Sequence, residues 1–389
     1  MISIALKNNS TIPRGAHRLA IGAFFFIQGL CFASWASRIP TIQQELGMSE
    51  AALGSVLLAL PAGLMLSLPI SGWLVAKVGS QRVVIIAAML YTFSLLSLGL
   101  VQSIFQLVVC LFVFGLIGNI MNISVNTQAV GVEALYKKSI MASFHGLWSL
   151  AGFTGAAVGT IMIGSGIDLF QHYIYITIFV LLTALLSFRY TLGEDANKKK
   201  DAPIFAKPDK ALLILGIIAF CSMLCEGAMF DWSGVYFRKV VKADPAWVGA
   251  GFTAFMSTMA AGRFVADWFT SRVGLKRVLQ LSGLLITLGL GVAVVLPALH
   301  TAIIGFLLVG VGVSSVVPLV YSAAGKSKIL SPGVALAAVS TIGFLGFLIG
   351  PPLIGIVAGF SSLQVSFSII ALMGLLIVAL AGKVITSES

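Results

Sequence analysis

The sequence predicts an all-α membrane protein in which twelve transmembrane helices form two pseudo-symmetric bundles of six. Three observations predict this fold. Of the 389 residues, 59% are hydrophobic and only 10% are charged, whereas a soluble domain carries about 25% charged residues. The apolar residues fall into twelve runs that are long enough to cross a bilayer as helices. The two halves of the chain also match each other at a fixed offset, with Gly79 over Gly274.

Each apolar run is expected to form a helix, because lipid leaves an open strand edge unsatisfied and the runs lack the alternation of barrel strands. The first run has spanning length and no small-residue cleavage site, so we interpret it as a helix and not as a signal peptide. In chain order the expected helices cover 18–39, 49–76, 83–102, 105–131, 139–166, 172–190, 211–237, 246–270, 278–297, 301–323, 332–359 and 362–382.

The Lys and Arg residues are distributed unequally between the two sides of the membrane. With a cytoplasmic N-terminus, most of the 24 Lys and Arg residues fall on the cytoplasmic side. We therefore expect a multi-pass protein of the bacterial inner membrane with both termini in the cytoplasm. The same distribution accounts for the net charge of +11. A nucleic-acid partner is not expected, because a basic face on a soluble module is lacking.

One long polar stretch divides the chain. Residues 191–210 carry charges of both signs and two prolines, which is typical of a flexible linker. We therefore expect an N-terminal bundle at 1–190, a cytoplasmic linker at 191–210 and a C-terminal bundle at 211–389. Parallel repeats of six helices are one architecture of secondary transporters.

Two polar loops carry the resemblance to a known family. The first loop reads Gly72-x-x-x-Ala76-Lys77-x-Gly79-x-x-Arg82 and resembles the signature loop of the major facilitator superfamily. Its repeat contains Gly262-Arg263, Asp267, and Arg272-x-Gly274-x-Lys276-Arg277. The family usually has Asp where this chain has Ala76, so gating is expected to depend more on the second loop. The resemblance implies gating roles for Gly72, Lys77, Gly79, Arg82, Arg263, Asp267, Arg272 and Gly274.

Four further strings resemble the YbjJ-type branch of that superfamily, which is distantly similar to sugar–proton symporters of the fucose permease kind. The resemblance implies a sugar or sugar-derived solute. Trp-Ala-Ser-Arg-Ile-Pro begins at Trp35, and Asn-Thr-Gln-Ala begins at Asn126. Ser-Phe-His-Gly begins at Ser143, and Glu-Gly-Ala-Met-Phe-Asp-Trp begins at Glu226.

Charged residues inside the spans are functional candidates because a charge in hydrocarbon is costly. Glu226 falls near the middle of the run 211–237, where we interpret it as a proton-binding carboxyl; a structural pair with Arg263 is the alternative. Asp231 lies nearer the outer end of the same run. It is a second proton-coupling candidate, or the partner of Arg38 in an outer gate, or a charge at headgroup level.

The run 105–131 carries three amides on one face. Asn119, Asn122 and Asn126 are spaced i, i+3 and i+7, so their side chains form one stripe. Amides donate and accept hydrogen bonds, which suits the hydroxyls of a sugar-like solute. Hydrogen bonding between helices is the alternative. Gln28, near the middle of the first run, is a further candidate for solute binding.

Aromatic and imidazole side chains complete the candidate site. His145 could relay a proton because imidazole titrates near neutral pH; a neutral ring bonded to backbone is the alternative. Trp148 shares its helix face. Trp35 and Trp232 fall at matching depths in the first spans of the two halves. They could stack on a ring-shaped solute or anchor the chain at the interface.

These observations favour a secondary transporter that moves a small polar solute together with a proton. Proton-driven efflux of amphipathic compounds is the alternative, and a non-transporting sensor or scaffold is a third class.

ATP-driven transport is not expected because a phosphate-binding GxxxxGK[ST] loop is lacking. Cys and His residues lack metal-ligand spacing, so neither a metal, a cofactor nor an enzymatic activity is expected. The expected partners are the solute, the proton and the lipid bilayer, with the chain acting as a monomer.

Overall fold

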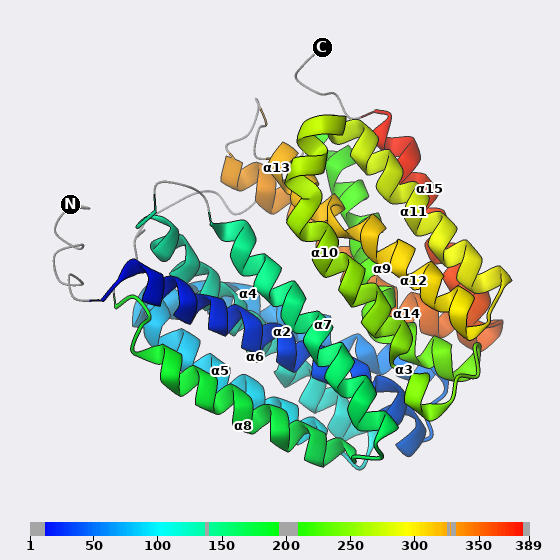
Figure 1. The fold of residues 1–389 in the computed structure, drawn as a ribbon, viewed down its shortest axis with the longest axis horizontal. Helices are drawn as coiled ribbons and strands as arrows, with labels where there is room; N and C mark the ends of the chain where they lie inside the picture. Colours follow the sequence, from blue (N-terminus) through cyan, green and yellow to red (C-terminus); the bar gives the residue numbers. More distant parts are fainter. Residues whose placement is uncertain (1–11, 137–139, 194–208, 325–326, 328–331, 384–389) are drawn as a thin grey trace. The chain divides into compact units, whose positions relative to one another are not determined.

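The computed structural model describes residues 12–136, 140–193, 209–324, 327 and 332–383. Every regular element in these ranges is a helix (Figure 1). The helices are α2 (Arg14–Glu45), α3 (Glu50–Leu57), α4 (Ala59–Val78), α5 (Ser80–Leu98), α6 (Ile104–Glu133), α7 (Met141–Gly164), α8 (Leu169–Phe188), α9 (Lys210–Lys239), the 3-10 helix η1 (Pro245–Trp247), α10 (Ala250–Val273), α11 (Leu275–Val295), α12 (Leu299–Ser314), α13 (Val316–Ala324), α14 (Pro332–Phe360) and α15 (Leu363–Ala381).

The predicted all-α membrane fold is confirmed, and each of the twelve expected runs contains helix. Two runs are interrupted: Leu58 separates α3 from α4, and Ser315 separates α12 from α13. Within the described ranges, eleven helical segments are long and apolar enough to cross a membrane. The eighth expected span, α10, is not among the eleven, and it carries the charged residues Arg263, Asp267 and Arg272.

Helix starts follow from local side-chain chemistry. A Ser or Asp before the helix accepts a hydrogen bond from an amide three residues later, which satisfies one of the amides left free in the first turn. Five helices begin in this way, at Ser49, Ser103, Asp168, Asp209 and Ser362.

The chain divides into two compact units. The first comprises Met1–Trp35 and Ala59–Lys200. Within it, α4 and α5 pack on α6, and α5 also packs on α8. Gly63 and Gly115 bring α4 and α6 close, because a Cβ atom at either position would collide with the facing helix backbone. Of the predicted linker 191–210, residues 194–208 lie outside the described residues.

The second unit comprises Ala36–Leu58 and Asp201–Ser389, so it includes the end of α2 and all of α3. Within it, α9 and α3 pack on α14, α10 and α11 pack on α12, and α11 packs on α15. Gly54 and Gly355 make the α3–α14 contact possible: a Cβ atom on Gly54 would lie 2.8 Å from the Gly355 Cα atom. Small residues thus bring the backbones together where lipid provides no hydrophobic driving force.

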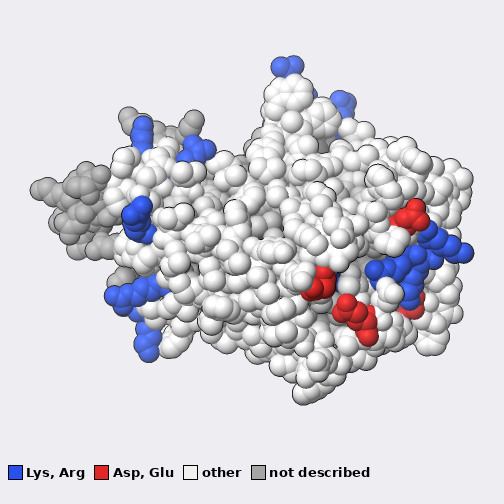
Figure 2. Space-filling model, turned by 60° about the horizontal axis from the view of Figure 1, so that its bottom comes forward, with Lys and Arg blue, Asp and Glu red and all other residues white. Residues whose placement is uncertain are grey.

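Large apolar side chains remain exposed on the described surface, as a bilayer-facing protein requires. Leu19, Phe105 and Phe360 are among the most exposed of them. Figure 2 shows a face formed mostly by uncharged residues, with Lys, Arg, Asp and Glu side chains gathered in a few places.

Candidate functional site

A buried ion pair joins α9 to α10. The Arg263 Nη2 atom donates to the Glu226 Oε1 atom over 3.0 Å, and the two side chains are 19% and 7% exposed. Each charge compensates the other, because an unpaired charge at this depth would be costly. The structural pairing expected as one alternative is therefore present. The proton-binding role of Glu226 stays a prediction.

Several buried polar atoms have no hydrogen-bond partner among the described residues. In the second unit these include the Ser222 Oγ and Trp232 Nε1 atoms, both on α9; in the first unit they include the Gln28 Oε1 and Trp35 Nε1 atoms, both on α2. Such atoms are rare because leaving one unsatisfied costs about 1–3 kcal/mol. Sequence reasoning missed Ser222, which lies one helical turn before Glu226.

The asparagine stripe on α6 divides into two parts. Asn119 is buried, and its Nδ2 atom donates to the Ser67 Oγ atom of α4 over 2.8 Å. It therefore forms the helix–helix bond that was the alternative to solute binding. Asn126 donates to the Oδ1 atom of Asn122 over 3.1 Å, and both side chains are half-buried. Gln28 Nε2 donates to the Gly118 carbonyl over 3.2 Å, which brings α2 next to the stripe.

His145 and Trp148 both contact α2 from α7. The His145 ring packs edge-on against Phe25 with 5.3 Å between centroids, and Trp148 lies 6.1 Å from Phe32. The His145 side chain is exposed. The proton-relay role of His145 stays a prediction.

The end of α9 packs against the end of α2 within the second unit. Arg238 donates to the Pro40 carbonyl, and Lys239 Nζ lies 2.6 Å from Glu50 Oε1. Arg38 is buried in the same stretch of α2. Asp231 is half-buried and forms no ion pair with a described residue, so its predicted pairing with Arg38 stays a prediction.

The two signature loops have the same backbone geometry. Gly79, between α4 and α5, has φ 91° and ψ 143°, and Gly274, between α10 and α11, has φ 84° and ψ 150°. These positive φ values favour glycine. Gly72 and Arg82 are exposed, as expected for loop-proximal residues, and the Asp267 side chain lies outside the described ones.

Each loop cation lies over a tryptophan ring one turn earlier in its helix. Lys77 Nζ is 4.6 Å from the Trp73 ring centroid, and Arg272 Cζ is 5.5 Å from that of Trp268. A ring of this kind attracts a cation by its quadrupole. Sequence reasoning missed both tryptophans, although their spacing from the cation repeats at the offset of the two halves.

Comparison with known proteins identifies the family. Residues 20–328 match the sequence profile of the Major Facilitator Superfamily. An uncharacterized MFS-type transporter of Yersinia pestis is 32% identical over 385 residues, covering 99% of this chain and 100% of that protein. The uncharacterized transporter y4wD of Sinorhizobium fredii is 32% identical over 365 residues, covering 93% and 96%.

Solved structures show the same fold at low identity. The inward-facing, unoccupied bacterial homolog of the human lysosomal transporter Spinster has a TM-score of 0.73 at 13% identity, covering 97% of this chain and 99% of that one. The nucleoside transporter NupG, as its D323A mutant, has a TM-score of 0.72 at 16% identity, covering 95% and 100%. By profile, relatives and fold, the chain belongs to the Major Facilitator Superfamily.

Proposed function

We propose that this transporter couples the movement of a small polar solute to a proton and carries both across the bacterial inner membrane by alternating access. Family membership supports transport of an unidentified substrate. The proposal adds the driving ion and the class of solute. The observation that carries it is the Glu226–Arg263 pair, a titratable carboxylate held in a buried site by one cation.

The proton and Arg263 compete for the same carboxylate. When Glu226 is ionised, Arg263 neutralises it over 3.0 Å. When Glu226 binds a proton, this charge attraction is lost, and the guanidinium donors of Arg263 become available to a solute oxygen. Return of the proton to water restores the pair. Asp231, which is half-buried on the same helix, is proposed to pass the proton to or from Glu226, and His145 is proposed as a second proton-binding group within the first unit.

Each unit by itself offers unpartnered atoms that suit a hydroxyl-bearing solute. Gln28 Oε1 accepts hydrogen bonds, whereas the Nε1 atoms of Trp35 and Trp232 donate them. The Trp rings can also stack on a sugar ring, and Asn122 and Asn126 add amides that both donate and accept. The resemblance to fucose-permease-like symporters supports the same class, a sugar or a sugar derivative.

Proteoliposomes test this proposal. With a pH gradient across the membrane, a panel of labelled sugars should contain one that enters against its gradient. Glu226→Gln should abolish this accumulation, because the amide cannot take up the proton. Glu45→Gln, which removes the exposed carboxylate at the end of α2, is the matched control and should accumulate normally. Normal accumulation by Glu226→Gln would refute the proton role.

A second candidate, proton-driven efflux of amphipathic compounds, rests on an aromatic cluster. Phe230, one turn after Glu226, has ring centroids of Phe252, Phe255 and Phe347 within 6.3 Å. Apolar rings beside a carboxylate are suited to binding a lipophilic cation. Outward flux of a cationic dye, with no accumulation of any sugar in the panel, would favour this candidate over symport.

A further inference from the structure

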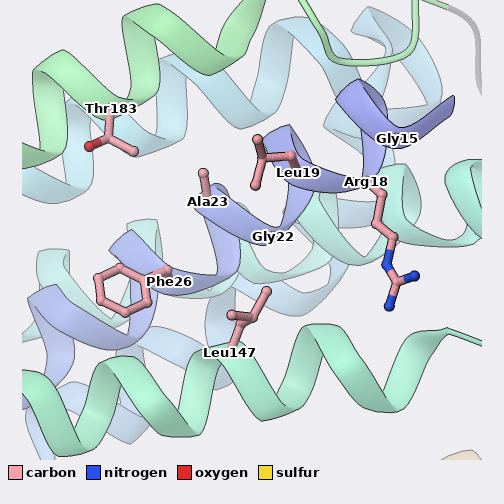
Figure 3. A pocket seen from close by; sticks show the side chains of 8 residues that line it. All are labelled: Gly15, Arg18, Leu19, Gly22, Ala23, Phe26, Leu147 and Thr183. Carbon is pink, nitrogen blue, oxygen red and sulfur yellow. The ribbon is translucent and has the colours of Figure 1, made fainter. Parts of the chain in front are cut away.

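A groove of about 430 Å³ lies on the first unit between the start of α2 and the helices α7 and α8 (Figure 3). Gly22 lets the Leu147 side chain pack closely against α2 in this groove, since a Cβ atom there would lie 2.7 Å from the Leu147 Cδ1 atom. The lining contains one cation and no acidic side chain. It consists of Gly15, Arg18, Leu19, Gly22, Ala23, Phe26, Leu147 and Thr183.

The cationic end of the groove is fixed by contacts within the first unit. Arg18 Nη2 donates to Ser143 Oγ over 3.2 Å. The guanidinium groups of Arg18 and Arg14 both lie over the Tyr136 ring, with Cζ atoms 5.7 and 5.3 Å from its centroid. Neither forms an ion pair with a carboxylate of the described residues. The Arg18 charge therefore lies at one end of the groove, and the Arg14 charge lies beside it over the same ring.

The rest of the groove is apolar and open. Leu19 is 77% exposed, and Ala23 and Phe26 are half-buried. Arg18 and Phe26 are eight residues apart on one helix, which corresponds to about 12 Å along its axis. Figure 3 shows Leu19, Ala23 and Phe26 following one another along α2, with Arg18 next to Leu19 and its side chain extending on the α7 side of the helix. A phosphate group bound to Arg18 could thus extend an acyl chain along this apolar row.

We propose that this groove binds one anionic phospholipid, with its phosphate at Arg18 and Arg14 and one acyl chain along Leu19, Ala23 and Phe26. Charge complementarity identifies the ligand, because paired guanidinium groups bind phosphate and the apolar row binds only hydrocarbon. Arg14 and Arg18 lie in the first turns of α2, so the expected orientation places this site in the cytoplasmic leaflet. The proposal does not depend on the identity of the transported solute.

Native mass spectrometry of the purified full chain tests the proposal, with phosphatidylglycerol and phosphatidylcholine as probes. Wild type should bind one phosphatidylglycerol more tightly than phosphatidylcholine. Arg18→Gln should weaken phosphatidylglycerol binding roughly fivefold, the ratio that corresponds to about 1 kcal/mol for one basic residue at a lipid surface. Ala23→Phe should weaken both lipids by filling the row. Lys276→Gln removes an exposed cation outside the groove and should change neither affinity.

A second measurement uses only the wild-type chain and therefore does not depend on folding of the variants. Phosphatidylglycerol with a photoreactive group on one acyl chain should crosslink to the segments of α2 and α7 that contain Phe26 and Leu147. Crosslinks found only elsewhere would overturn the proposal. Equal affinity of Arg18→Gln and wild type for phosphatidylglycerol would also overturn it.

Discussion

The Arg263 guanidinium lies 3.0 Å from the Glu226 carboxylate and connects two helices with different proposed tasks. Glu226 is on α9, the helix that also carries the unpartnered Ser222 and Trp232 atoms. Arg263 is on α10, which ends at the signature-loop residue Gly274. We propose that binding of a proton by Glu226 breaks this link between α9 and α10, the helix that leads into the second loop.

The buried pair should show strong energetic coupling. Removing one partner of a buried ion pair leaves the other charge uncompensated and costs about 3–5 kcal/mol. We therefore expect Arg263→Gln to destabilise the chain strongly. The double variant Glu226→Gln/Arg263→Gln should be more stable than the sum of the two single effects predicts. A double-mutant cycle on unfolding free energies in detergent measures this, and additive effects would contradict the pairing.

The contact between α3 and α14 should be sensitive to side-chain size at Gly54. A Cβ atom there would meet backbone atoms of Pro351 and Gly355, which cannot rotate away. Gly54→Val should destabilise the chain by about 1–3 kcal/mol through overpacking. Gly291→Val is the matched control, because a Cβ atom at Gly291 meets nothing within 4 Å. Thermal unfolding of both variants checks this, and equal melting temperatures would show that α3 does not pack as described.

The two loop glycines should respond alike to alanine. Gly79 and Gly274 have φ values of 91° and 84°, which L-residues adopt at a cost of roughly 1–2 kcal/mol. Gly79→Ala and Gly274→Ala should each lower the melting temperature, whereas Gly72→Ala should not, since its Cβ atom meets no neighbour and its φ is not positive. A lower melting temperature for only one of the two alanine variants would contradict the equivalent geometry of the two loops.

The exposed pair of Lys239 and Glu50 should contribute little to stability. Their side chains are 39% and 24% exposed, and exposed pairs contribute about 0–1 kcal/mol, less in salt. Glu50→Gln should therefore change the unfolding free energy by less than about 1 kcal/mol, with the difference vanishing at high salt. A larger loss that persists in salt would indicate that this pair carries more of the α3 packing than its exposure allows.

Hydropathy located the helices because spanning length and continuous apolarity are properties of the local sequence. The break at Leu58 was not predicted, because the run 49–76 remains apolar through it. Likewise, the association of residues 36–58 with the second unit depends on tertiary contacts such as Gly54 with Gly355. Such contacts leave no period or motif in a single sequence.

The sequence predicted which residues belong to the candidate site, but not which of them bond to one another. Glu226 and Arg263 could be identified because they are charged residues within predicted spans. The asparagine stripe could be identified from its helical spacing. The bond from Asn119 to Ser67 could not be predicted, because it depends on how closely α4 approaches α6. Ser222 was missed because a lone serine in an apolar run resembles ordinary helix packing. Trp73 and Trp268 could have been found from their repeated spacing to Lys77 and Arg272.

Proton movement driven by the solute is the most direct measure of proton coupling in this transporter. Proteoliposomes with a pH-sensitive dye inside and no preset pH gradient should acidify internally when the transported solute is added outside. We expect Glu226→Gln to abolish this acidification while still exchanging labelled for unlabelled solute. Wild-type solute entry without any proton movement, or unchanged acidification in Glu226→Gln, would contradict it.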